Sequence, residues 1–482
     1  MTRVLTAVLL FTATLAADAP DPGEWGRFRG PNGSGVSASR RLPAEFGPST
    51  NVIWKTELPF GHSSPALSRD RIFLTAARGN RLMTICLDRE TGRIVWEREA
   101  PRAREEKIDS RNGPAGPTPA TDGANVYVFF ADFGLISYDM DGAERWRLPL
   151  GPFNNLYGMG ASPVLVDDLV VLVCDQNTES FIVAVGQRDG RVRWKTARPE
   201  AHSGHSTPIL YTPGTSERPL REGGPRGERT QIIVPGSFLL TAYAAATGEK
   251  VWWVGGLCFE LKSTPVVSGD TLYINGFGTP QNQPGSQPSI ESFADIVRQY
   301  ADATGTVTLA RLPNGNARSW IDLDANGVVS SSEWNYYRAA MASENGMLAI
   351  RLGGRGDMTN ANVRWRYHKA VPQLPSPIVY GNVVYMVNDG GIVTALNPDT
   401  GAEIGQGRLK GAIDHYYASP IAADGKIFMF SEKGKVAVLA PGGSLEPVVV
   451  NDLDDDIYAT PAISNGRIYL RTRGWLYCFG LR

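Results

Sequence analysis

The chain has 482 residues, enough for two to four average domains or for one large repeat architecture. Its 53 Gly and 33 Pro make it turn often, which argues against a helical bundle, and its 42% of hydrophobic residues argue against intrinsic disorder. With 48 Lys and Arg against 49 Asp and Glu, the formal net charge of −1 gives no overall basic field that would attract nucleic acid or anionic lipid.

The first residues have the pattern of a secretory signal peptide. Arg3 provides a short positive region, an apolar stretch covers residues 4–15, and small residues follow at Ala16, Ala17 and Ala19. This stretch is too short to cross a bilayer, which needs about 20 residues. We interpret residues 1–19 as a cleaved signal peptide and expect an exported protein, periplasmic or extracellular, without a transmembrane segment. Residues 20–50 form an N-terminal extension with an FRGP motif at residues 28–31.

Residues 51–482 are built from repeats. A Ser-Pro or Thr-Pro step, an apolar strand, a tight turn and two further strands recur along this part of the chain. Neighbouring copies lie 41 to 57 residues apart, except for one interval of 112 residues that contains an insertion. Four strands per unit at this spacing are typical of propeller blades. Eight prolines mark the copies: Pro65, Pro119, Pro163, Pro208, Pro265, Pro377, Pro420 and Pro461.

The two ends of this region complement each other. The last copy contains only three strands, whereas the segment NVIWKTEL near residue 51 is a lone strand. Joining them closes the ring and leaves no open sheet edge. The sequence therefore predicts an all-β fold, an eight-bladed β-propeller closed by both termini, with a small helical insertion in blade five.

Most copies end in an Asp-Gly or Thr-Gly turn followed by a tryptophan. Glycine tolerates the positive φ that reverses the chain, and each tryptophan supplies about 150–250 Å² of apolar surface. We expect six tryptophans to join neighbouring blades: Trp54, Trp96, Trp146, Trp194, Trp252 and Trp365. This unit resembles the pyrroloquinoline-quinone (PQQ) repeat of quinoprotein-like eight-bladed propellers. The opening WGRFRGPNGSGVS, with PTPATDGANVYVFF and STPIL, resembles an exported bacterial subgroup of PQQ-like repeat proteins.

The insertion, residues 281–345, contains an EF-hand-like motif. The segment DLDANGVVSSSE, residues 322–333, matches the twelve-residue EF-hand calcium loop. Oxygen-bearing side chains stand at loop positions 1, 3 and 5, and Gly327 at position 6 permits the sharp bend. Position 7 offers its backbone carbonyl, position 9 acts directly or through water, and position 12 closes the site with two oxygens. We expect one Ca²⁺ held by Asp322, Asp324, Asn326, Val328, Ser330 and Glu333.

A second, degenerate loop precedes this one. Residues 305–308 match residues 327–330 and predict a short β-link between the two loops. In that alignment Tyr300 takes position 1, Asp302 position 3, and Arg311 position 12. Because the closing carboxylate is replaced by a cation, we expect the upstream loop to be structural and to hold no calcium.

Other chemistry-bearing residues form no recognisable catalytic motif. The cysteines are expected to be buried free thiols, and the histidines form no zinc motif. Several polar clusters either line one face of the ring or are ordinary loop residues. The cysteines are Cys86, Cys174, Cys258 and Cys478, and the polar clusters are Arg111 with Asn112, Asp175 to Asn177, His202, His205, and His415 to Tyr417.

The sequence leaves three functions open. We favour an exported, non-catalytic propeller that binds or scaffolds an unknown protein or small-molecule ligand as a monomer and carries calcium in its insertion. The second function is that of a PQQ-dependent dehydrogenase. Such enzymes carry an adjacent cysteine pair beside the quinone and hold a central calcium with Glu, Asn and Asp, and neither set can be assigned here. The third is outer-membrane protein assembly, by a propeller that shares the repeats but is lipid-anchored and lacks an EF-hand.

Overall fold

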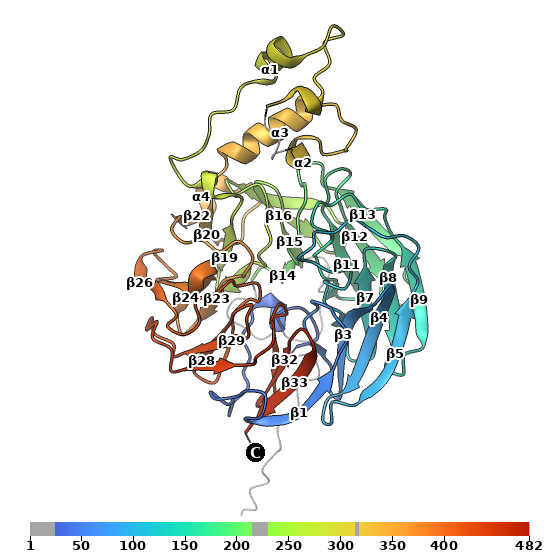
Figure 1. Ribbon diagram of the computed structural model, residues 1–482, viewed down its shortest axis with the longest axis vertical. Helices are drawn as coiled ribbons and strands as arrows, with labels where there is room; N and C mark the ends of the chain where they lie inside the picture. The colour runs from blue at the N-terminus through green and yellow to red at the C-terminus, as the bar shows by residue number, and fades with distance from the viewer. Residues whose placement is uncertain (1–24, 215–229, 314–317, 482) are drawn as a thin grey trace, which may run out of the picture.

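A computed structural model describes residues 25–214, 230–313 and 318–481 of the chain. The predicted signal peptide, residues 1–19, lies outside the described residues. The strands form eight sheets arranged as blades around a central axis (Figure 1). This confirms the predicted all-β, eight-bladed propeller.

Within each of the first four blades, successive strands pair antiparallel in chain order. Blade one contains β2 (Ala66–Leu67), β3 (Arg71–Arg78), β4 (Arg81–Asp88) and β5 (Ile94–Ala100). Blade two contains β6 (Ala120–Thr121), β7 (Asn125–Phe130), β8 (Gly134–Asp139) and β9 (Glu144–Pro149). Blade three contains β10 (Val164–Val166), β11 (Leu169–Cys174), β12 (Phe181–Gly186) and β13 (Val192–Ala197), and blade four β14 (Ile209–Tyr211), β15 (Gln231–Pro235), β16 (Leu239–Ala244) and β17 (Lys250–Gly255).

The other four blades complete the ring. Blade five contains β18 (Val266–Ser268), β19 (Thr271–Gly276), β20 (Gly346–Arg351) and β22 (Val363–Tyr367), and blade six β23 (Ile378–Tyr380), β24 (Val383–Asn388), β25 (Ile392–Leu396) and β26 (Glu403–Arg408). Blade seven contains β27 (Ile421–Ala423), β28 (Lys426–Phe430), β29 (Lys435–Leu439) and β30 (Val449–Asp452). Blade eight joins β31 (Ala462–Ser464), β32 (Arg467–Arg471) and β33 (Trp475–Gly480) to β1 (Val52–Glu57), which pairs antiparallel with β33.

Five of the six predicted tryptophans join one blade to the next. Trp146 in blade two donates from Nε1 to the carbonyl of Gln187 in blade three at 2.8 Å. Its indole also covers Gly190, whose φ is +66° and where a Cβ would lie 2.6 Å from the ring. A side chain there would collide with the tryptophan, so this turn requires glycine. The same arrangement recurs in the pairs Trp54 with Gly92, Trp96 with Gly142, Trp194 with Gly248, and Trp365 with Gly401.

Trp252 is buried in an apolar core that contains residues of blades four and five, but its hydrogen bond differs from that of the other five. Its Nε1 donates to Oε1 of Gln231 in its own blade at 2.8 Å. Blade five has no turn glycine to receive it, because the connection between β20 and β22 is longer and irregular. Part of that connection, β21 (Gly356–Asp357), instead adds to β17 as a fifth, parallel strand and pairs with Trp252.

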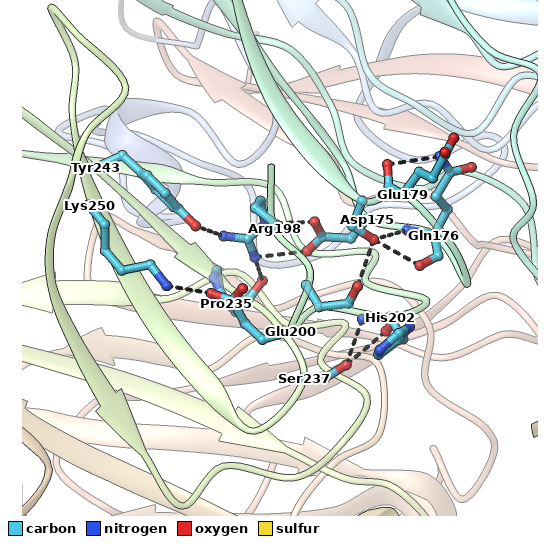
Figure 2. Close-up of polar contacts among 12 residues, drawn as sticks. Asp175, Gln176, Glu179, Arg198, Glu200, His202, Pro235, Ser237, Tyr243 and Lys250 are labelled. Carbon is cyan, nitrogen blue, oxygen red and sulfur yellow. Dashed lines mark hydrogen bonds and ion pairs between the residues drawn. The ribbon is translucent and has the colours of Figure 1, made fainter. Parts of the chain in front are cut away.

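A buried ion pair within blade three is bonded to blade four. Arg198 donates to both carboxylate oxygens of Asp175, at 2.7 and 2.9 Å, and also to the hydroxyl of Tyr243 at 2.7 Å (Figure 2). Both charged side chains are 1% exposed. Because a buried charge without a partner is costly, this network favours one fixed packing of the two blades.

The insertion lies between β19 and β20 and projects from the ring (Figure 1). It contains α1 (Phe293–Tyr300), α2 (Arg318–Ile321) and α3 (Ser331–Ala342), with short 3₁₀ turns at Pro280–Asn282 and Leu309–Arg311. Its apolar residues form a core of their own, which also includes Cys258 and Phe259 from the connection between blades four and five. The insertion is therefore packed onto the propeller.

Candidate functional site

A cavity of about 360 Å³ lies at the centre of the ring. All eight blades, or the segments leading into them, contribute to its wall. The residue before each marker proline lines it in seven blades: Ser64, Thr118, Ser162, Thr207, Ser376, Ser419 and Thr460. The repeated Ser-Pro or Thr-Pro step thus places a hydroxyl group at the same height in successive blades.

These hydroxyls form a chain of hydrogen bonds around the axis. In six of the eight blade junctions, the backbone N–H of one Ser or Thr donates to the hydroxyl of its counterpart in the next blade, at 2.9 to 3.0 Å. Each bond satisfies a buried N–H that no strand partner could reach. The six pairs are Ser64 with Thr118, Thr118 with Ser162, Ser162 with Thr207, Thr264 with Ser376, Ser376 with Ser419, and Ser419 with Thr460.

The N-terminal extension closes one end of the cavity. Residues 25–37 cross the axis, where a short blue turn is visible at the centre of the ring in Figure 1. The segment is held by inner strands of several blades, through hydrogen bonds between Leu67 and Trp25, Thr121 and Gly26, and Ser37 and Ala422. Phe28 lines the cavity and forms part of its floor.

Two histidines of the wall are held neutral by burial. Burial lowers the pKa of His62 to about 4, with Arg471 adding a smaller effect in the same direction. Burial likewise lowers the pKa of His205 to about 4. The ring of His62 stacks on Tyr458, with centroids 4.5 Å apart. Both imidazoles are therefore uncharged at neutral pH.

The structure separates the polar clusters that the sequence singled out. Arg111, Asn112, His205 and Tyr417 line the cavity. Asp175 belongs to the buried ion pair with Arg198 in blade three. His202 lies beneath the insertion, His415 is exposed beside Asp389, and Tyr416 is buried with its hydroxyl donating to Ala412.

Several wall residues were missed by the sequence analysis. The hydroxyl series had a visible signal, since a Ser or Thr precedes every marker proline. Phe28, His62, Tyr157 and Lys262 had none, because their places depend on loops whose course no periodicity encodes. The cysteines are free and buried as expected, and burial raises the pKa of Cys86 and of Cys478 to about 12.

The loop of the insertion gathers the predicted acidic residues. Carboxylate oxygens of Asp322, Asp324 and Glu333 all lie within 4.8 Å of one another. Gly327 has a φ of +81°, which turns the chain sharply. Asn326 donates from its amide group to Asp324 at 2.7 Å, and its N–H donates to Asp322 at 3.0 Å. The side chain of Val328 is partly exposed.

Glu333 is fixed at the start of α3. Its Oε2 accepts from the N–H and the hydroxyl of Ser330, at 2.9 and 2.6 Å, while the Ser330 hydroxyl caps the helix. Its Oε1 accepts from the N–H of Leu323 at 2.8 Å. Glu333 is 8% exposed, so its carboxylate is held at the loop by several donors.

The upstream loop runs antiparallel to this one. Val329 donates to the carbonyl of Val307, and Leu309 to that of Gly327, each at 2.9 Å. This is the short β-link expected between the two segments. Arg311 donates to the carbonyl of Tyr300 at 3.4 Å, so the cation stands where a closing carboxylate would be needed.

The loop and the helices beside it also contact the ring. The amide group of Asn154 donates to the carbonyl of Leu323 at 2.8 Å. Trp320 packs against Phe259, and Tyr336 of α3 meets His202 with centroids 4.3 Å apart. Asp322, Asp324 and Glu333 form the single group of three or more candidate metal-ligating His, Cys, Asp or Glu within the residues described.

The ring of four-stranded blades around a central cavity defines the chain as a quinoprotein-like eight-bladed propeller. The family profile described as outer membrane protein assembly factor BamB matches residues 44–209 and 178–482, and the chain belongs to that family. Among curated proteins, no match is found. Of the helices in the described residues, none has the length and apolar character needed to cross a membrane.

Solved structures of several functions share the fold. BamB from Moraxella catarrhalis is 15% identical, with 89% of this chain and 98% of that chain covered and a TM-score of 0.52. A europium-containing methanol dehydrogenase is 9% identical, with 96% and 98% covered and a TM-score of 0.55. The quinohemoprotein alcohol dehydrogenase ADHIIG from Pseudomonas putida HK5 is 14% identical, with 95% and 80% covered and a TM-score of 0.54. At these identities the likeness shows the fold alone.

Proposed function

We propose that the chain is an exported, non-catalytic propeller that acts as a binding or scaffold protein and holds one calcium ion in an EF-hand loop of its insertion. One observation supports calcium binding most directly. Carboxylate oxygens of Asp322, Asp324 and Glu333 lie within 4.8 Å of one another on a loop that bends at Gly327. Calcium prefers several oxygen ligands, including carboxylates, and three carboxylates leave a local charge of about −1 on binding.

The composition of the cavity supports a binding role over a catalytic one. Its one carboxylate, Asp109, is paired with Arg111 at 2.8 Å. Its two histidines are neutral, and it contains no cysteine. A general base or nucleophile needs a partner within hydrogen-bond reach that activates it, and the described wall residues offer no such pair.

The cavity residues do not fit the cofactor set of a PQQ-dependent dehydrogenase. Those enzymes resemble this chain in fold but hold a central calcium with Glu, Asn and Asp side chains, whereas Asp109 is the one acidic side chain lining this cavity. Their adjacent cysteine pair also has no counterpart, because Cys86, Cys174, Cys258 and Cys478 are buried apart from one another. We derive no quinone chemistry for the chain.

The calcium site is tested by calorimetric titration of metal-stripped protein. We expect one Ca²⁺ per chain and an affinity about tenfold or more weaker in Glu333→Gln, which removes the charge that closes the site. Glu344→Gln is the matched control, since Glu344 is exposed within the same insertion and its carboxylate accepts a hydrogen bond from Gln287. The β-signal in circular dichroism should be unchanged in both variants. Equal affinity in Glu333→Gln, or no binding to the parent, would contradict the proposal.

Membership of the family favours a second candidate, a role in outer-membrane protein assembly. Such a role would use the propeller to bind other proteins, consistent with a scaffold. Its test is deletion of the gene in its own host, followed by quantification of outer-membrane β-barrel proteins. A specific fall in the levels of these proteins, restored by the intact gene, would favour this candidate. Unchanged levels would exclude it and favour a binding or scaffold protein outside outer-membrane assembly.

A further inference from the structure

We propose that the central cavity is a binding site for a small organic oxyanion, a compound that carries carboxylate or phosphate groups. The inference deepens the proposed binding role and rests on it by naming the class of ligand. It concerns the axis of the ring, whereas the calcium loop lies in the insertion.

The hydroxyl series presents hydrogen-bond donors to the cavity. In six of the lining residues the hydroxyl oxygen already accepts a backbone N–H from the preceding blade. No acceptor for the O–H of these hydroxyls is found among the described residues, so each proton is available to a ligand. A ring of donors is the arrangement that an oxyanion requires.

Two buried arginines donate to backbone carbonyls beside residues of the cavity wall. Arg29 and Arg471 are at most 1% exposed, and neither guanidinium forms an ion pair with a carboxylate of the described residues. Arg29 donates to the carbonyl of Pro377, next to Ser376, and Arg471 to that of Ser63, next to Ser64. Burial lowers the pKa of each to about 9, so both remain charged at neutral pH. An anion at the axis would offset this buried charge.

Two imidazole nitrogens and a lysine also lie in the wall. Nε2 of His62 and Nε2 of His205 are buried without a hydrogen-bond partner in the described part of the chain, and Nε2 of His205 lies 4.0 Å from a carboxylate oxygen of Glu260. Lys262 lines the cavity and is 9% exposed. Its partner Glu260 is not part of the lining, and Asp109 is already paired with Arg111. The hydroxyl series and the Lys262 ammonium, which line the cavity, therefore favour a negatively charged ligand.

The size of the cavity limits the ligand. A volume of about 360 Å³ is at the lower end of the range for small-molecule sites and too small for a folded partner. Phe28 closes the floor, while Tyr157, Tyr417 and Tyr458 provide apolar faces for the carbon skeleton of an organic anion.

The test is calorimetric titration of the full chain, at low ionic strength and constant calcium, with succinate, inorganic phosphate and succinamide. Succinamide has the skeleton of succinate without its charges. We expect one succinate or phosphate per chain and no binding of succinamide. Binding of phosphate alone would assign a phosphorylated ligand, and binding of succinate alone a carboxylate.

Three variants locate the binding. Lys262→Gln and the more exposed Arg111→Gln should each weaken anion binding, the first by tenfold or more. Arg81→Gln, which removes an exposed cation paired with Glu99 on blade one, should leave it unchanged. Failure of both anions to bind, equal binding of succinamide, or an equal loss in Arg81→Gln would overturn the inference. Calcium binding is measured separately in the same samples, so failure of the calcium site and failure of the cavity are distinguishable.

Discussion

At the residue scale, one side chain has two roles in six of the eight blades. There the Ser or Thr before the marker proline accepts an N–H from the neighbouring blade and also lines the cavity. The repeat therefore couples closure of the ring to the chemistry of its centre. The candidate calcium ligands could be proposed from the sequence because an EF-hand loop is local, whereas the cavity wall combines residues that are far apart in the chain.

The first prediction concerns this hydroxyl series. Ser419→Ala removes the acceptor of the Ser376 N–H and leaves that buried group unsatisfied. We expect the free energy of unfolding to fall by about 1–3 kcal/mol. Urea denaturation measures the change, with Ser286→Ala as the control, because Ser286 is exposed and its hydroxyl has no hydrogen-bond partner among the residues that the structure describes. Equal stability of the two variants would mean that the hydroxyl series does not join the blades.

The second prediction concerns pH. His62 and His205 have pKa values of about 4 in the folded protein and an ordinary value of 6.5 when unfolded. Between these values the unfolded chain binds more protons, so stability should fall as the pH is lowered from 6.5 to 4, by roughly 3 kcal/mol per histidine. Denaturation of His205→Gln at pH 7 and pH 5 should show a shallower dependence than the parent. An unchanged dependence would mean that His205 is accessible to protons.

At the element scale, the blades are joined by a tryptophan of one and a turn glycine of the next. This pairing was visible in the sequence as a repeated turn followed by Trp. The glycine half of the pairing is missing at Trp252, because the connection after β20 replaces the turn and adds β21 to blade four. The course of residues 25–37 across the axis was not predictable either, since this segment pairs with strands remote in the sequence.

The third prediction separates backbone strain from this packing. Gly190 and Gly79 both have positive φ, +66° and +61°, but a Cβ at Gly190 would lie 2.6 Å from Trp146, whereas nothing lies within 4 Å at Gly79. Gly79→Ala should cost about 1–2 kcal/mol from backbone strain alone, and Gly190→Ala clearly more. Thermal unfolding compares them. Equal losses of stability in the two variants would show that Trp146 can move away from the added methyl group at no energetic cost.

At the scale of the whole molecule, the fold did not decide the function. The same ring of blades is shared by BamB and by alcohol dehydrogenases. The number of blades could be predicted because each repeat encodes its own turns and its marker proline. The side chains that line the central cavity could not be predicted, because they depend on which loops reach the centre. Those loops provide donors and positive charge, while the described acidic ligands gather in the insertion.

The central claim is that the chain is a binding propeller whose calcium lies in the insertion. The most direct test is anomalous diffraction from crystals of the full chain grown with Tb³⁺ in place of Ca²⁺, since this lanthanide takes oxygen-rich calcium sites and scatters strongly. We expect one strong peak between Asp322, Asp324 and Glu333, and none at the axis. A peak in the central cavity, with none at the loop, would contradict the account and favour a metal-dependent dehydrogenase.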